Sequence, residues 1–277
     1  MTATSEKAEC PAASTRPPRQ GLKLIGGGAV VDMPLGQPGN LLFESYPAPE
    51  GDSWVAGAKS HKWSSPQATV KAFGIYLVDP DDLWDVKVVS VSTDADSNAP
   101  EVTAILPPGY ALTGGGAKIT HRNPNGGLLL RESRPVQIQG EYRGWTARGT
   151  DHMDPDVGSA EAFVIGIRPR NGAEIPPSTV LFVDNKERDK AKGGVYWPSL
   201  ELGAKLSEEV IIGGGAATGY DPPPPSMLTA SGFTPDNQKW FAAARTHVTP
   251  GSPSIAERQY VELSIWAVTR KGRLVPL

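Results

Sequence analysis

Gly-Gly-Gly-Ala occurs three times in this chain, at residues 26–29, 114–117 and 213–216. After each copy the same landmarks follow in the same order: a Ser, a Trp, a His seven residues beyond the Trp, and an Ile in an apolar run. The landmarks are Ser45, Ser133 and Ser231; Trp54, Trp145 and Trp240; His61, His152 and His247; and Ile75, Ile165 and Ile265. Agreement at four landmarks in three copies predicts an internal threefold repeat, with periods of 88 and 99 residues.

Short strands rather than helices are expected throughout the chain. The 277 residues include 31 Gly and 27 Pro, which interrupt helices and favour turns. Apolar residues alternate around each Ile landmark, as in Phe73, Ile75 and Leu77, which is typical of a half-buried strand. We therefore predict an all-β, pseudo-threefold fold with about four or five strands per unit. The repeat favours a β-prism, in which three small sheets pack around one axis, and another closed threefold β assembly is the alternative.

The repeat also predicts the domain organisation. Residues 21–277 are expected to form one domain of three repeats, about 21–85, 86–177 and 178–277. Residues 1–20 are polar and lack an apolar run, so we expect them to be a disordered tail. Because little sequence follows the third Ile landmark, we expect the two chain ends to complete the third unit together and to close a ring of strands.

The glycines and tryptophans are interpreted as packing devices. A phosphate cradle needs a following helix, whereas the sequence after each Gly run is strand-like, so the glycines are expected where backbones approach closely. Each Trp begins a large-small-small pattern on one strand face, as in Trp54, Ala56 and Ala58. This pattern predicts a ring of Trp packed around the axis, and stacking platforms for sugars are the alternative.

Charge and cysteine content narrow the classes of partner. With 27 basic and 30 acidic residues and no basic stripe, the chain is not expected to bind nucleic acid. The single cysteine, Cys10, excludes an intramolecular disulfide. No signal-peptide h-region and no apolar run of about 18 residues is present. We therefore expect no membrane span and a cytoplasmic location, with export by a non-classical route as the alternative.

The three repeated His residues are the candidate ligand-binding sites. Their polar neighbours complete three pairs: Ser60-His61, Asp151-His152 and Thr246-His247. On a regular strand, seven residues beyond the Trp is the opposite face, so each pair is expected to form a shallow outward site that hydrogen-bonds a ligand. Two alternatives stay open: the His side chains fix turns through their own backbone, or they converge on the axis to bind zinc. No metal or other cofactor is expected, because no carboxylate recurs beside them.

Catalytic residues are not expected from the repeat. If the protein is an enzyme, the second copy is the most polar, and His152, Asp151 and Glu132 would carry the chemistry. A carboxylate pair is not repeated, since Ala230 stands where the other copies have Glu44 and Glu132. His121 has no counterpart in the other copies and is expected to be a surface residue.

A threefold, Gly-rich β-repeat is similar in outline to β-prism lectins and to egg-envelope prism proteins. This resemblance implies carbohydrate or glycoconjugate binding. The expected function is therefore that of a soluble, multivalent, lectin-like protein with up to three equivalent sites. The alternatives are a hydrolase or cyclase with one diverged pocket near the second repeat, and a receptor-binding module of a toxin or host-interaction protein.

Overall fold

A computed structural model describes residues 1–5, 11–15, 20–32, 40–60, 67–151, 155–173, 180–190, 199–203, 209–220, 227–234, 239–245 and 259–269. Every helix-or-strand element in these ranges is a β-strand, so the predicted all-β class is confirmed. Consequently, the described residues contain no helix long and apolar enough to cross a membrane.

The strands fall into three groups of six in chain order, here called the first, second and third unit. The first unit is β1 (Thr2–Thr4), β2 (Ala12–Ser14), β3 (Leu22–Asp32), β4 (Leu41–Pro47), β5 (Trp54–Lys59) and β6 (Thr69–Val78). The second unit is β7 (Trp84–Ser92), β8 (Glu101–Ile105), β9 (Ala111–His121), β10 (Leu129–Ile138), β11 (Glu141–Thr150) and β12 (Gly158–Pro169). The third unit is β13 (Val180–Lys190), β14 (Ser199–Gly203), β15 (Glu209–Tyr220), β16 (Met227–Phe233), β17 (Lys239–Arg245) and β18 (Gln259–Thr269).

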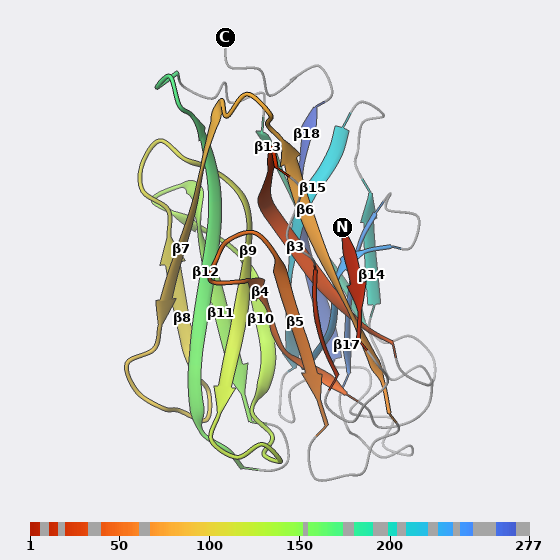
Figure 1. Cartoon of the computed structure of the whole chain (residues 1–277). Helices are drawn as coiled ribbons and strands as arrows, with labels where there is room; N and C mark the ends of the chain where they lie inside the picture. Colours follow the sequence, from red (N-terminus) through yellow and green to blue (C-terminus); the bar gives the residue numbers. More distant parts are fainter. Residues whose placement is uncertain are drawn as a thin grey trace.

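The described strands form three antiparallel sheets of six strands, and each sheet combines strands of two units. Their orders are β1-β6-β3-β16-β17-β14, β13-β18-β15-β10-β11-β8 and β2-β5-β4-β9-β12-β7. Figure 1 shows the last of these from β7 through β12, β9 and β4 to β5. In every sheet the Gly-rich strand of one unit lies beside the Ser strand of another, so the units interlock rather than stack.

The described sheets differ from the expected closed ring. Each of the three orders begins and ends with an unshared edge strand, so none of these sheets closes on itself. The edge strands are mostly short: β1 and β2 have 3 residues each, and β8 and β14 have 5 each. Segments this short carry too little alternation to be recognised, which is why the sequence predicts four or five strands per unit, whereas the described residues form six in each.

The expectation of a disordered tail over residues 1–20 is wrong for the two segments described there. β1 pairs with β6 and β2 pairs with β5, as β7 and β8 pair with β12 and β11 in the second unit. The first chain segment therefore supplies the edge strands of the first unit, whereas the sequence predicts that it helps to complete the third. Small side chains suit this place, since Ala13 is buried against the core. The Thr15 hydroxyl accepts a hydrogen bond from the backbone N–H of Trp54 at 2.8 Å.

Each junction between units is a short ladder with the same register. Ser231 pairs with Ala29, Ser45 with Ala117 and Ser133 with Ala216, so the Ala of each Gly-Gly-Gly-Ala faces the Ser landmark of another unit. Two residue pairs form each of these ladders. The junctions are thus much shorter than the ladders within a unit, such as the one between β3 and β6.

The glycines lie where side chains would collide, which confirms their interpretation as packing devices. A Cβ atom at Gly27, Gly115 or Gly214 would overlap the indole of the Trp in the same unit. That Trp belongs to the neighbouring sheet, so the middle Gly sets the distance between two sheets. A Cβ at the preceding Gly114 would lie 2.7 Å from the Cα of Gly26, where two Gly strands meet.

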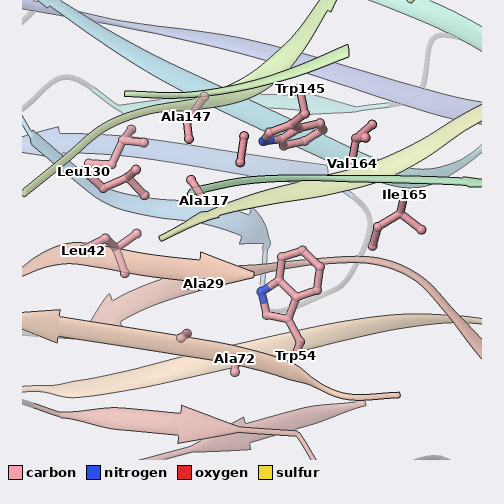
Figure 2. Packing of buried hydrophobic residues seen from close by; sticks show 14 of the residues in the cluster. Ala29, Leu42, Trp54, Ala72, Ala117, Leu130, Trp145, Ala147, Val164 and Ile165 are labelled. Carbon is pink, nitrogen blue, oxygen red and sulfur yellow. The ribbon is translucent and has the colours of Figure 1, made fainter. Parts of the chain in front are cut away.

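Among the residues whose burial the structure describes, the three tryptophans are the largest fully buried side chains, and the predicted burial of this set is confirmed. Trp54, Trp145 and Trp240 are 0–1% exposed, which excludes them as stacking platforms for sugars. Figure 2 shows the Trp54 and Trp145 indoles in one core with leucines and alanines from several strands. Each indole N–H donates to the hydroxyl of its own Ser landmark, at 3.0, 3.0 and 3.1 Å. The polar atom of each Trp is thereby satisfied inside an apolar core.

A small hollow lies among these groups. Its lining includes the Ser45, Ser133 and Ser231 side chains together with the middle glycines and Leu42, Leu130 and Leu228. Its volume is about 10 Å³, close to the smallest space that accommodates one water molecule. The core is therefore nearly filled, and a ligand larger than water has no room there.

The contact between Gly115 and Trp145 is testable by adding one methyl group. We expect Gly115→Ala to lower the free energy of unfolding by about 3 kcal/mol, because the methyl group overlaps an immobile buried ring. Gly149→Ala is the matched control on β11, where the nearest atoms are side-chain ends of Ile119 and Pro100 at 3.0 and 3.3 Å, which need to shift by only a few tenths of an ångström. The control should stay within about 1 kcal/mol in urea unfolding. Equal losses in the two variants would contradict the packing role of the middle Gly.

The indole–hydroxyl bond in the first unit is testable by a double-mutant cycle. We expect Ser45→Ala to lower the free energy of unfolding by about 1–2 kcal/mol, because it removes the acceptor of a buried N–H. In a Trp54→Phe background the same change should cost about 1 kcal/mol less. Ser90→Ala, at an exposed position of β7, is the control and should be nearly neutral. A coupling energy of zero would show that the bond does not contribute to stability.

Candidate functional site

The three Trp strands end around one small buried cluster. Leu41, Leu129 and Met227 are fully buried and contact one another. In the strand registers they pair with Lys59, Thr150 and Arg245, the last residues of β5, β11 and β17. These three strand ends therefore lie at the same end of the molecule, around a common centre. The repeated His residues follow two positions later in each chain segment.

The predicted ligand residues are only partly within the described ranges. Ser60 and Asp151 are half-buried residues just after β5 and β11. The Asp151 N–H donates to the Asn98 carbonyl at 2.8 Å, which fixes the backbone at that position. His61, His152, Thr246 and His247 lie outside the described residues. The structure thus places the strand ends that carry the three pairs, while the direction of the His side chains stays a prediction.

Lys59 holds the loop between β9 and β10. Its side chain is almost completely buried, and its Nζ donates to the Gly126 carbonyl at 2.7 Å. A second carbonyl, that of Pro124, lies 3.5 Å away. Lys59 is not among the predicted site residues, although the sequence carries a signal for it: five residues after each Trp stands a polar side chain, Lys59, Thr150 or Arg245.

Asp156 supports the same loop from the other side. It is buried, and its Oδ1 accepts hydrogen bonds from the Asn123 N–H at 3.2 Å and from the Val157 N–H at 2.8 Å. A side chain at Gly126 would overlap the carboxylate, so this position requires Gly. The Asp156 Oδ2 has no hydrogen-bond partner among the described residues. A buried oxygen left in this condition is a place where a water molecule or a ligand hydroxyl would be favoured.

His121 is not the plain surface residue that the sequence predicts. It is half-buried at the end of β9, packs edge-on against the Phe43 ring at 5.5 Å, and has a buried Nδ1 without a described partner. Burial lowers its pKa, and the positive charge of Lys59 lowers it further, while Asp156 acts in the opposite direction. His121 is therefore a neutral imidazole near pH 7. Its Nδ1 and the Asp156 Oδ2 are two unsatisfied polar atoms at one end of the molecule.

Asp151 lies in an environment that disfavours its charge. Burial raises the pKa of its carboxyl group, a hydrogen bond to its own backbone partly offsets this rise, and the negative charge of Asp156 adds to it. Two carboxylates and a neutral imidazole can offer both donors and acceptors to a hydroxylated ligand. Groups of this kind can also transfer protons.

Glu132, the third residue of the alternative catalytic set, has a different surrounding. It is buried on β10, accepts a hydrogen bond from the Arg134 Nε at 2.7 Å, and forms an ion pair with Arg148 at 3.5 Å. Arg148 in turn binds Glu101. No hydrogen bond or ion pair between Glu132 and Asp151 occurs among the described residues, and His152 lies outside them, so the alternative catalytic set stays a prediction.

Metal binding by the described side chains is not supported. Over the described ranges, no three His, Cys, Asp or Glu residues lie close enough to share a metal ion. Because the three repeated His residues lie outside these ranges, the zinc alternative for them stays untested.

Comparisons with known proteins do not assign a class. No protein-family model matches the chain, and no curated protein sequence matches it.

The unfavourable environment of the Asp151 carboxylate gives a pH-dependent prediction. A carboxyl group whose folded pKa is raised stabilises the fold while it is protonated, and this contribution is lost as the pH rises through the folded pKa. We therefore expect Asp151→Asn to be more stable than the parent at pH 7, and the difference to shrink as the pH falls toward about 4. Urea unfolding of both proteins across this range measures the difference. A parent protein that is more stable than the variant at pH 7 would contradict the raised pKa of the Asp151 carboxyl group.

Proposed function

We propose that the protein is a multivalent, lectin-like carbohydrate-binding protein with a β-prism fold of pseudo-threefold symmetry. Its ligand face is the end of the molecule that carries Lys59, Thr150 and Arg245 and the segments that follow them. Sugar hydroxyls bind there to the pairs Ser60-His61, Asp151-His152 and Thr246-His247.

The prism is supported by contacts that occur three times. The same register joins Ser and Ala at the three unit junctions, and the same indole–hydroxyl bond occurs in each unit. Three six-stranded sheets with corresponding strand orders fit an arrangement around one axis.

The ligand face rests on one observation, the cluster of Leu41, Leu129 and Met227. Because this cluster gathers the ends of β5, β11 and β17, three His-bearing segments leave the fold at one face. Weak sites on one rigid face can bind a branched or clustered glycan together, and such avidity exceeds the single-site affinity by about 10²- to 10⁴-fold. Imidazole, hydroxyl and carboxylate groups supply the donors and acceptors that sugar hydroxyls need.

One observation also favours a second candidate, a hydrolase with a single site near the second unit. The raised pKa of Asp151 is what a general acid requires, and this residue adjoins His152. In that case one unit carries the chemistry and the other two are structural.

Replacement of the three His residues distinguishes the two candidates. We expect His61→Ala/His152→Ala/His247→Ala to lose at least tenfold in apparent affinity on a glycan array, and each single variant to lose part of it. A Lys71→Ala/Lys87→Ala protein, changed at two exposed strand positions, is the control and should keep the parent profile. Circular dichroism and thermal unfolding verify that the variants are folded.

Two outcomes would count against the lectin proposal. A triple variant with the parent glycan profile would remove the proposed sites. Hydrolysis of glycosides that depends on His152 and Asp151, with His61→Ala and His247→Ala silent, would support the hydrolase instead.

A further inference from the structure

A second hollow lies at the end of the molecule opposite the ligand face, which carries Lys59. It measures about 280 Å³ and is lined by Asp85, Arg168, Pro169, Arg170 and Gly172. The paired ends of β7 and β12 form its wall, with Trp84 opposite Pro169. The other end of β12 pairs with His121, so the two regions are about 35 Å apart along the strand. A hollow of this size is at the lower limit for small-molecule sites and suits a single sugar ring.

The guanidinium of Arg168 is held in place before any ligand arrives. Its Nε donates to the Asp85 Oδ2 at 3.0 Å, and its central carbon lies 4.5 Å from the centre of the Tyr110 ring. The Tyr110 hydroxyl donates to the same oxygen at 2.5 Å. These contacts use the Nε edge and one face of the guanidinium. The two terminal nitrogens are the edge that can bind a carboxylate with two parallel hydrogen bonds.

The rest of the wall is equally fixed. The Arg170 N–H donates to the Leu83 carbonyl at 2.9 Å, and the Gly172 N–H closes a turn onto the Pro169 carbonyl at 3.2 Å. Gly172 has φ of +77°, a conformation that favours glycine. The Arg170 side chain lies 3.3 Å from Asp82, whose charge is also balanced by Lys23. The lining therefore contains two guanidinium groups, those of Arg168 and Arg170, and one carboxylate, that of Asp85.

Asp85 restricts the kind of ligand. The hydrogen bond from Tyr110 and the neighbouring Arg168 and Arg170 lower its pKa, so it is ionised at neutral pH. Its Oδ2 is occupied by Tyr110 and Arg168, whereas its Oδ1 accepts no hydrogen bond from the described residues. That oxygen can accept a hydrogen bond from a hydroxyl group, and its negative charge repels a phosphate dianion more strongly than a singly charged carboxylate. The ligand that fits has one planar carboxylate and adjacent hydroxyl groups.

The fold itself does not require a cation at this position. Three residues after each Ile landmark stand Val78, Arg168 and Val268, and Val78 is largely exposed. The first and third units thus place a valine where the second unit has Arg168. The stacked and ion-paired arginine is therefore a feature of the second unit alone.

We infer that this hollow is a binding site for an acidic monosaccharide, a uronic acid or a sugar with an equivalent carboxylate. The carboxylate binds the terminal nitrogens of Arg168, with Arg170 beside it, and a ring hydroxyl donates to Asp85. The site is separate from the His-bearing face and does not depend on the function proposed for that face.

Titration of the ¹⁵N-labelled full chain with sodium glucuronate tests the inference. We expect shifts of the Gly172 and Arg170 amides that saturate at millimolar ligand, and at least tenfold weaker binding of glucose, which lacks the carboxylate. Arg168→Lys keeps the charge but loses the planar fork, and should weaken glucuronate binding at least tenfold. Arg168→Val adopts the residue of the other units, should stay folded, and should abolish binding. Arg122→Gln, an exposed arginine near the other end of β12, is the matched control and should bind as the parent does.

Three results would overturn the inference. The first is that glucuronate causes no saturable shifts. The second is that glucose or inorganic phosphate binds as tightly as glucuronate. The third is that Arg122→Gln and Arg168→Lys lose the same affinity for glucuronate. The triple His variant separates this test from that of the lectin proposal. It should bind glucuronate as the parent does, whatever its glycan profile.

Discussion

Close packing of each buried indole on the middle glycine of its unit governs the arrangement of all three sheets. The Trp lies on one sheet and the Gly on the next, so this contact fixes how closely two sheets approach. The indole N–H needs an acceptor in a core that excludes water, and the Ser landmark provides it. That Ser also lies in the two-pair ladder that joins two units. One Gly, one Trp and one Ser in each unit therefore act together. The Gly and Trp set the distance between two sheets, and the Ser both accepts the indole hydrogen bond and lies in the ladder that joins two units.

Strand exchange has a consequence for the two ends of the molecule. Because each sheet contains three strands from each of two units, the Trp strands of all units end together around Leu41, Leu129 and Met227. The side chains next to this cluster differ between units: Lys59, Thr150 and Arg245 share a register position, but Thr150 is uncharged where the other two are basic. The repeated core thus supports an asymmetric surface. The second unit differs most, with Asp151 and Asp156 at one end and Arg168 at the other.

Part of the fold and little of the site could be predicted from the sequence. Burial of Trp54, Trp145 and Trp240 is predictable because a large-small-small pattern on one strand face is typical of a packed core. The strands at residues 2–4 and 12–14 are not predictable, since three residues carry no readable period. Lys59 and His121 escape prediction as functional candidates because burial of a polar side chain depends on a loop from elsewhere in the chain. The stacking of Arg168 on Tyr110 is equally inaccessible, since it depends on the pairing of β12 with β9, two strands that are distant in the sequence.

The all-β class, the burial of the tryptophans and the requirement for glycine beside them are encoded locally in the amino-acid sequence. They follow from the two-residue period of a strand and from the volume of a side chain. The pairing of Ser231 with Ala29, and of Lys59 with a carbonyl 67 residues away, is established only by the folded arrangement. A period identifies which face of a strand is buried but not which strand lies beside it. That choice depends on close packing of indole on glycine between sheets, which exists only after the whole chain has folded.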